Sequence, residues 1–200
     1  MARDRTPKHK LSRREGRDLF GTGGESLQRR LDVLPGMHGR KHRRRGSEYS
    51  LQLREKQKVK RIYGVHEAQF VRIFQQALKT REITGLALLR LLERRLDNVV
   101  YRLGLARTRP QARQFVSHGL VEVDGEKVNI PSYLVEAGQI VSLKEGAQKI
   151  PDVTELRENK PPIPGWLQSE DGGGRVLREP ERHEIDDDIQ EQRIVEFYSR

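Results

Sequence analysis

The sequence predicts an α+β protein: a helical N-terminal part, an inserted α-α-β-β-β module, and a flexible basic arm at the N-terminus. Three observations predict this class. Residues 84–104 carry a leucine-rich helical repeat, residues 124–125 form an Asp-Gly hairpin signal, and the first 46 residues lack apolar periodicity. Only 34% of the 200 residues are hydrophobic. The chain can therefore build one or two modest cores.

The predicted arm, residues 1–46, is rich in glycine and basic residues and contains few large apolar side chains. Such a segment buries too little surface to fold alone, so we expect it to become ordered on a partner. The formal charge is +10 overall, and the first 61 residues carry +12 whereas residues 151–200 carry −6. A basic arm of this kind is typical of nucleic-acid binding, and the alternative is a solvated disordered tail.

Three helices are expected next. Ser47 is a plausible N-cap for a helix that runs to Gly64, and a second helix covers residues 67–80. The third begins at the cap residue Thr84 and ends at Gly104. One face of this third helix carries the apolar residues Leu88, Leu89, Leu92, Leu96, Val99, Val100 and Leu103, which predicts the main core element. Arg95 and Arg102 lie at the margin of that face, where their stems can pack while their heads reach outward.

A fourth helix is expected between Thr108, its cap, and Gly119, with Pro110 in the first turn. Its apolar residues Ala112, Phe115 and Val116 face the preceding helix. Arg109, Arg113 and Ser117 are spaced four residues apart and so form one polar stripe, which we expect to face solvent. Reversal of both arginine charges is accordingly expected to leave the fold intact.

The remaining elements are a hairpin, a third strand, a linker and a terminal helix. Residues 120–130 alternate around Asp124-Gly125, which predicts a type I′ turn, and residues 139–143 read as a strand. The Pro- and Gly-rich residues 159–175 predict a linker, and residues 186–200 predict an amphipathic helix that docks through apolar side chains. We therefore expect four regions: 1–46 (arm), 47–90 (helical domain, with 160–200 packing back on it), 91–159 (module) and 160–200 (linker and C-terminal helix).

The polar stripe has two interpretations. Two guanidiniums one turn apart can contact successive phosphates as forked donors, and Lys127 of the hairpin would lie near the same edge. Alternatively, Arg113 pairs with Glu122 and Arg109 serves only solubility. The spacing itself does not decide between them.

Several classes of function are disfavoured. The chain has no cysteine, so disulfides and thiolate-zinc sites are excluded. His38 and His42 are a weak metal signal, and we expect no metal and no cofactor. The glycine runs lack the Lys-Ser/Thr of a phosphate-binding loop, and no catalytic triad spacing is present, which predicts a protein that is not an enzyme. No apolar run is long enough for a membrane span, and no secretory signal is recognisable, so a cytoplasmic location is expected.

A resemblance makes the prediction more specific. Residues 95–135 read "RLDNVVYRLGLARTRPQARQFVSHGLVEVDGEKVNIPSYLV" and resemble the S-four RNA-binding domain. The segments "KLSRREGRDLF", "PGMHGRKHRRR", "YSLQLREKQKVKRIYGVHEAQF" and "IVEFYSR" resemble the bacterial S-four family of small-subunit ribosomal proteins, in its cysteine-free form. The match covers nearly the whole chain.

That resemblance implies a primary binder of small-subunit ribosomal RNA, which nucleates assembly of the subunit body on the five-prime domain. It also implies a contribution to translational accuracy and a place at the messenger entry channel beside ribosomal proteins of the S-five and S-three types, with messenger RNA as a further candidate partner. The alternative is a free-standing RNA-binding, RNA-modification or quality-control factor that carries the same module.

The candidate RNA-binding residues combine the charge pattern with the resemblance, and no single one is expected to dominate. In the arm they are Arg3, Arg5, Lys8, Lys10, Arg13, Arg14, Arg40, Lys41, Arg43, Arg44 and Arg45. In the first helix they are Tyr49, Arg54, Lys56, Lys58 and Arg61. In the module they are Arg95, Arg102, Thr108, Arg109, Arg113, Ser117, His118 and Lys127.

Overall fold

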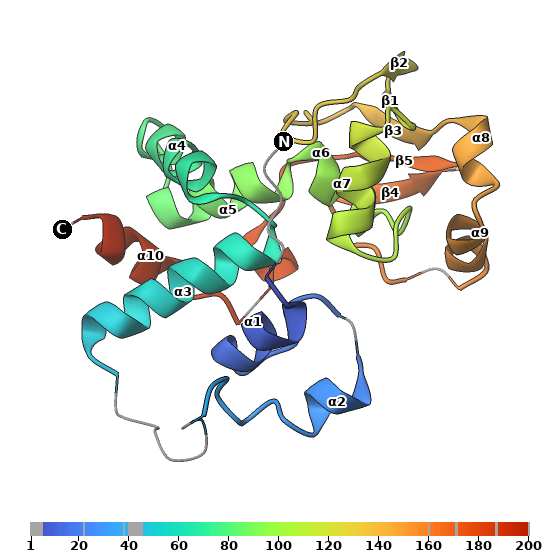
Figure 1. The fold of residues 1–200 in the computed structure, drawn as a ribbon. Coiled ribbons are helices and arrows are strands. Elements are labelled where there is room, and N and C mark those ends of the chain that lie inside the picture. The colour runs from blue at the N-terminus through green and yellow to red at the C-terminus, as the bar shows by residue number, and fades with distance from the viewer. Residues whose placement is uncertain are drawn as a thin grey trace. The chain divides into compact units, whose positions relative to one another are not determined.

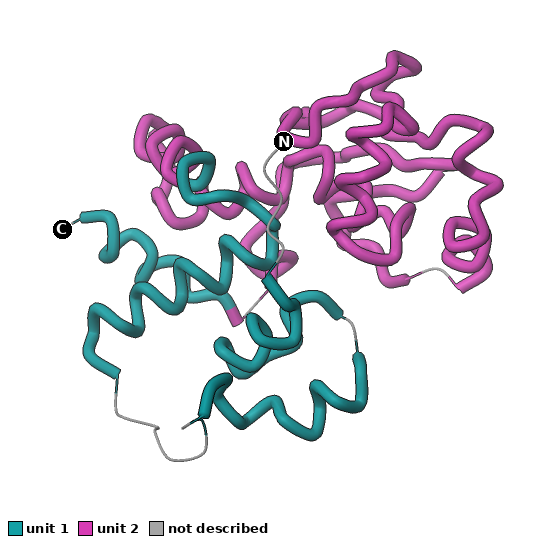
Figure 2. The backbone as a smooth tube through the Cα atoms, in the orientation of Figure 1, with its two compact units in different colours: residues 1–70, 189–200 teal, residues 71–188 magenta. Residues whose placement is uncertain are grey.

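The structure, a computed structural model, describes residues 6–21, 23–37, 39, 46–159, 161–170, 172–186 and 188–199. The chain forms two compact units: unit 1 comprises residues 1–70 and 189–200, and unit 2 comprises residues 71–188 (Figure 2). Helices dominate unit 1 and a small antiparallel sheet lies in unit 2, which confirms the α+β class (Figure 1). Within the described ranges, no helix has the length and apolar character that a bilayer crossing requires.

Unit 1 contains α1 (Lys8–Glu15), α2 (Glu25–Gln28), α3 (Glu48–Ile62), α10 (Glu191–Tyr198) and the start of α4 (Glu67–Leu78). Ser47 caps α3 as predicted, because its side chain accepts a hydrogen bond from the Ser50 amide. The two short N-terminal helices differ from the expected aperiodic arm. They form where Leu11, Leu19 and Leu27 are buried, so a few well-spaced leucines are enough to order this stretch.

The C-terminal helix α10 packs along α3 (Figure 1). Ile189 and Ile194 are buried, and the Lys56 ammonium lies 4.6 Å from the centroid of the Phe197 ring. The helix begins at Glu191, later than the predicted start at residue 186. Apolar burial and a cation–π contact thus hold the end of the chain in place.

Unit 2 contains α5 (Thr84–Glu93), α6 (Leu96–Arg102), α7 (Arg109–Ser117), β1 (Val121–Val123), β2 (Glu126–Lys127), β3 (Ile140–Leu143), α8 (Glu145–Gln148), α9 (Pro151–Glu158), β4 (Leu167–Glu170), β5 (Gly173–Val176) and the 3₁₀ turn Arg182–Glu184. The strands form one antiparallel sheet in the order β2-β1-β3-β5-β4. Asp124 and Gly125 both have positive φ, at 51° and 82°, as the predicted type I′ turn requires.

The last two strands lie in the segment that we expected to be a linker. Strand β5 needs its glycines because β3 approaches closely: a Cβ on Gly173 would meet the Val141 carbonyl oxygen at 2.3 Å. The same residues that make the segment look like a linker therefore allow a strand to join the sheet. Sequence patterns also missed α8 and α9, which follow the third predicted strand.

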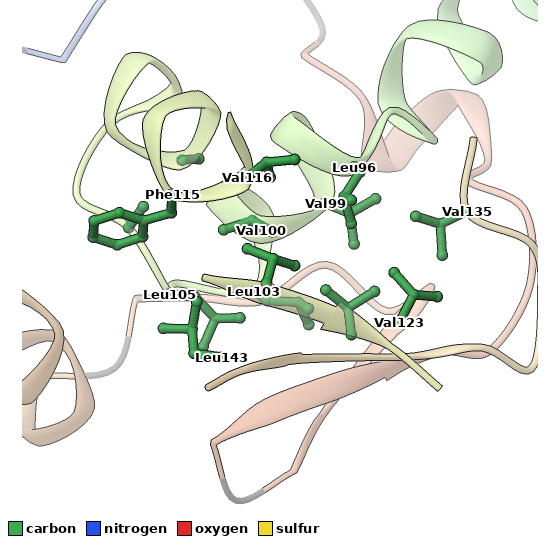
Figure 3. Close-up of a cluster of buried hydrophobic side chains, with 14 of the residues drawn as sticks. Leu96, Val99, Val100, Leu103, Leu105, Phe115, Val116, Val123, Val135 and Leu143 are labelled. Atoms are coloured by element: carbon green, nitrogen blue, oxygen red, sulfur yellow. The ribbon is translucent and has the colours of Figure 1, made fainter. Parts of the chain in front are cut away.

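The core of unit 2 lies between α6, α7 and the sheet (Figure 3). Val100 of α6, Leu103 directly after it and Phe115 of α7 belong to the same buried cluster as Val123 and Leu143 of the strands (Figure 3). Trp166, which precedes β4, is fully buried in the same cluster. The prediction that the helices pack through these apolar faces is confirmed.

The long helix predicted for residues 84–104 is wrong in two respects: it breaks at Arg94–Arg95, and Thr84 does not cap it. Arg95 is extended, with φ −63° and ψ 135°, and pairs with Leu134 in an isolated bridge. The Leu96 amide donates to the Tyr133 carbonyl at 2.8 Å, and the Val135 amide donates to the Arg94 carbonyl at 2.9 Å. Hydrogen bonds to residues 131–135 thus replace the bonds that the helix loses, so the break costs little.

Replacement of Phe115 by alanine is expected to lower the free energy of unfolding of unit 2 by about 3–5 kcal/mol, because the ring is buried between α7 and the sheet. Urea denaturation of the full chain measures this loss. The neighbouring Gln114 is exposed on the same helix, and its replacement by alanine is the matched control. Equal effects of the two changes would contradict the packing described here.

Glu67 of α4 collects three donors: Lys56 at 2.6 Å, Lys60 at 2.9 Å and the Tyr198 hydroxyl at 3.0 Å. Burial favours the neutral acid, but the hydrogen bonds from these donors outweigh it and lower the pKa of Glu67 to about 2. Burial and the bond to Glu67 raise the pKa of Tyr198. The ionised carboxylate therefore links α3, α4 and α10.

A pH dependence follows from the lowered pKa of Glu67. The wild-type chain should be more stable than Glu67→Gln above about pH 4.5, the ordinary pKa of glutamate. This advantage should diminish as the pH falls toward 2, because the folded carboxylate then becomes protonated. Urea midpoints of both proteins, measured across this range, test the expectation. A difference that stays constant with pH would show that the charge of Glu67 is not what stabilises the contact.

Candidate nucleic-acid interface

Asp97 in the first turn of α6 binds two arginines. It accepts hydrogen bonds from Arg95 Nε and Nη2 at 3.1 and 2.8 Å, and from Arg113 Nη1 of α7 at 2.9 Å. The Arg95 side chain is only 3% exposed. The expectation that its head reaches outward is therefore wrong, because the helix break turns Arg95 toward the carboxylate.

A second network lies beside the first. The buried Glu93 at the end of α5 accepts two hydrogen bonds from Arg102, at 3.0 and 2.7 Å, and one from Asn98 Nδ2 at 2.7 Å. Asn98 Oδ1 in turn accepts from Arg109 Nε of α7 at 2.8 Å. The Arg109 guanidinium carbon lies 4.5 Å from the centroid of the Tyr101 ring. The network thus joins α5, α6 and α7.

The stripe predicted on α7 therefore does not point simply to solvent. Arg109 and Arg113 contact consecutive residues of α6, Asn98 and Asp97. Glu122, the predicted alternative partner of Arg113, pairs with Lys144 at 3.9 Å. The two networks contain four guanidinium groups (Arg95, Arg102, Arg109, Arg113) and two carboxylates (Glu93, Asp97). These four guanidiniums outnumber the two carboxylates by two, and hydrogen bonds hold all four against α5 and α6.

The remaining module candidates lie at the ends of α7. Thr108 caps the helix, because its side chain accepts a hydrogen bond from the Gln111 amide as predicted. Ser117 donates to the Arg113 carbonyl, and His118 is exposed at the C-terminal end. Lys127 of β2 lies close to Gly119: a Cβ atom added to Gly119 would lie 2.2 Å from Cε of Lys127. Lys127 therefore lies beside the end of α7, as expected.

In unit 1, a buried carboxylate organises several candidates. Glu15 of α1 binds both Arg54, at 3.2 Å, and Arg61 of α3. Burial raises the pKa of Glu15, although the neighbouring arginines oppose this effect. Arg13 donates to the carbonyls of Val33 and Leu34, so it ties α1 to the segment after α2. These three arginines therefore support the fold of unit 1 as well as its charge.

Other candidates in unit 1 differ in accessibility. Lys56 and Lys58 are buried and pair with Glu67 and Glu55, which makes them structural contacts. Tyr49 is 50% exposed, and its ring centroid lies 5.6 Å from that of Phe197. The exposed basic candidates of α1 are Lys8, Lys10 and Arg14. Seven candidates lie outside the described residues: Arg3, Arg5, Arg40, Lys41, Arg43, Arg44 and Arg45.

Four residues of the networks were not among the sequence candidates: Glu93, Asp97, Asn98 and Tyr101. Helical periodicity gave no signal for them, because Asp97 and Asn98 fall outside the apolar face of the predicted helix, where polar residues are ordinarily exposed. The described part of the chain contains no cluster of three metal-ligating side chains, and the His38–His42 pair falls outside it.

Comparison with known proteins places the two halves of the chain in one class. Residues 3–93 match the model of the "Ribosomal protein S4/S9 N-terminal domain", and residues 94–141, which include α6, α7 and the hairpin, match the "S4 domain". Both matches define a ribosomal protein with an S4 RNA-binding domain.

Full-length relatives identify the family. The chain is 49% identical to the small ribosomal subunit protein uS4 of Natranaerobius thermophilus over 209 residues, which is 100% of both chains. It is 50% identical to the same protein of Dictyoglomus thermophilum over 208 residues, again 100% of both. The Streptococcus uberis relative is 49% identical over 100% of this chain and 99% of its own. The chain belongs to the uS4 family of small ribosomal subunit proteins.

The Asp97 network corrects the expectation that charge reversal on α7 leaves the fold intact. Arg113→Glu would place a carboxylate against the buried Asp97, and we expect it to lower the free energy of unfolding by about 1–3 kcal/mol. Arg107→Glu is the matched control, since Arg107 pairs with Glu155 at an exposed site and should change stability by at most about 1 kcal/mol. Urea denaturation compares the two, and equal losses would contradict the burial argument.

Proposed function

We propose that this chain is a primary binder of small-subunit ribosomal RNA that nucleates assembly of the subunit body on the five-prime domain. The observation that carries the proposal is the pair of arginine networks on α6 and α7. They hold Arg109 and Arg113 on rigid helices with an excess of positive charge. Guanidiniums bind phosphates through forked donors, and structured RNA is recognised largely through its backbone and shape.

Unit 1 supports the same proposal. Its described basic residues include the exposed Lys8, Lys10 and Arg14 of α1, which contribute to the chain's net charge of +10. We propose that these residues, together with the basic candidates of 1–5 and 40–45, extend the RNA contact beyond the module. Contacts from two units give the large, salt-dependent surface that a primary binder needs.

The further parts of the proposal follow from the family. We propose that the protein acts in the cytoplasm as part of the ribosome, near the messenger entry channel, where it contributes to translational accuracy. Ribosomal proteins of the S-five and S-three types are its proposed neighbours there, and messenger RNA is a further proposed contact. Nothing in the described residues favours an enzymatic role over this binding role.

Filter binding of the full chain to a five-prime-domain transcript tests the proposal. Arg109→Gln combined with Arg113→Gln should weaken binding at least about tenfold and reduce the salt slope by up to about two units, because two phosphate contacts are lost. Glutamine retains donors for Asn98 and Asp97, so the fold should survive.

The control is Arg157→Gln combined with Arg175→Gln, which removes the same charge from α9 and β5. Unchanged affinity of the α7 variant, or an equal loss in the control, would overturn the assignment of the interface. Sedimentation separates the alternative function: a ribosomal protein stays with small subunits in moderate salt, whereas a free-standing RNA factor dissociates.

A further inference from the structure

The amide of Asn98 has only one orientation that satisfies its neighbours. Its Nδ2 group lies 2.7 Å from Glu93 Oε2 and 2.9 Å from the Glu93 carbonyl oxygen, and both of these atoms accept hydrogen bonds. The amino group must therefore face Glu93, which leaves Oδ1 to accept from Arg109 Nε. Glu93 thus fixes the orientation of the Asn98 amide, whose oxygen accepts a hydrogen bond from Arg109.

Burial makes this arrangement rigid. Asn98 is 2% exposed and Glu93 is fully buried, so water does not compete for their hydrogen bonds. Hydrogen bonds in such an environment are electrostatically strong, and leaving one of the groups unpaired is costly. Arg102 donates two further hydrogen bonds to Glu93, so the carboxylate that accepts from Asn98 is itself held in place.

Two contacts then define the plane of the Arg109 guanidinium. Its Nε is held by Asn98, and its face lies over the Tyr101 ring. An arginine whose stem and plane are already fixed loses less conformational freedom when it binds a phosphate. This saving of conformational freedom applies to Arg109 and not to Arg113. Asn98 lies within hydrogen-bond distance of Arg109, whereas Arg113 is held by Asp97.

We propose that Asn98 is a positioning residue for RNA binding, which, with Glu93 behind it, orients Arg109 without touching RNA itself. The proposal rests on the function proposed above and deepens it. An aspartate at position 98 would set two carboxylates face to face, and an aliphatic residue would remove the acceptor that holds Arg109 Nε. An amide meets both requirements, since it has a donor on one side and an acceptor on the other.

The test is a double-mutant cycle in the full chain, read by filter binding to the five-prime-domain transcript. Asn98→Ala should weaken binding about three- to tenfold, which corresponds to the ordering of one long side chain. The salt slope should fall by about one unit or less, because one phosphate contact is lost. In the Arg109→Gln background the same change should cost less than about twofold, since the residue through which Asn98 acts is gone.

Gln148→Ala is the matched control. Gln148 is a half-buried amide of α8 that bonds the Leu143 carbonyl and Arg157, so its loss removes comparable hydrogen bonds away from α7. It should leave RNA affinity unchanged. Should Asn98→Ala fail to fold, Asn98→Ser carries the same test, because serine retains a polar group near Glu93 but is too short to reach Arg109 as well.

The outcomes are separable. Equal losses from Asn98→Ala in both backgrounds, or an unchanged salt slope, would overturn the positioning role and show that Asn98 serves only the fold. If Arg109→Gln alone leaves affinity unchanged, the proposed interface fails, whatever Asn98 does. A loss that occurs only when Arg109 is present supports the inference.

Discussion

The break between α5 and α6 is the constraint on which the two arginine networks depend. If the chain had continued as one helix through Arg95, the Asn98 amide could not donate to Glu93, and Asp97 could not accept hydrogen bonds from Arg95. Hydrogen bonds to residues 131–135 compensate the broken helix. A loop that follows the hairpin thus fixes the register of a helix that precedes it, and this long-range contact brings the polar side chains together.

This origin explains why local patterns predicted the helices but not their break. Apolar periodicity over residues 84–104 is satisfied by both a continuous helix and a broken one, because Leu88, Leu92, Leu96 and Val99 are buried in either case. The bridge from Arg95 to Leu134 joins residues far apart in the sequence, and no local signal records it. By contrast, the caps Ser47 and Thr108 and the Asp124-Gly125 turn depend on neighbouring residues alone, and the structure has each where the sequence predicts it.

The candidate site shows the same division. Charge and spacing identified Arg109 and Arg113, and the structure brings them together with Arg95 and Arg102. The acidic and amide partners were missed because Asp97 and Asn98 fall outside the apolar face of the predicted helix, where a polar residue is ordinarily exposed to solvent. Lys56 and Lys58 show the opposite case: a basic helix face predicts RNA contact, yet both lysines form ion pairs within the fold. Glu67, the partner of Lys56, lies on the neighbouring helix α4, and Glu55, the partner of Lys58, lies one turn away on α3.

The discontinuity of unit 1 has a consequence for synthesis of the chain. Its helix α3 is translated early, whereas the α10 segment that packs on it comes after the whole of unit 2. Domains generally fold as units while the chain emerges, so unit 2, which is continuous, can mature first. Until α10 is synthesised, the face of α3 on which it packs stays uncovered in the nascent protein. The order of the elements along the chain therefore makes completion of unit 1 later than the synthesis of unit 2.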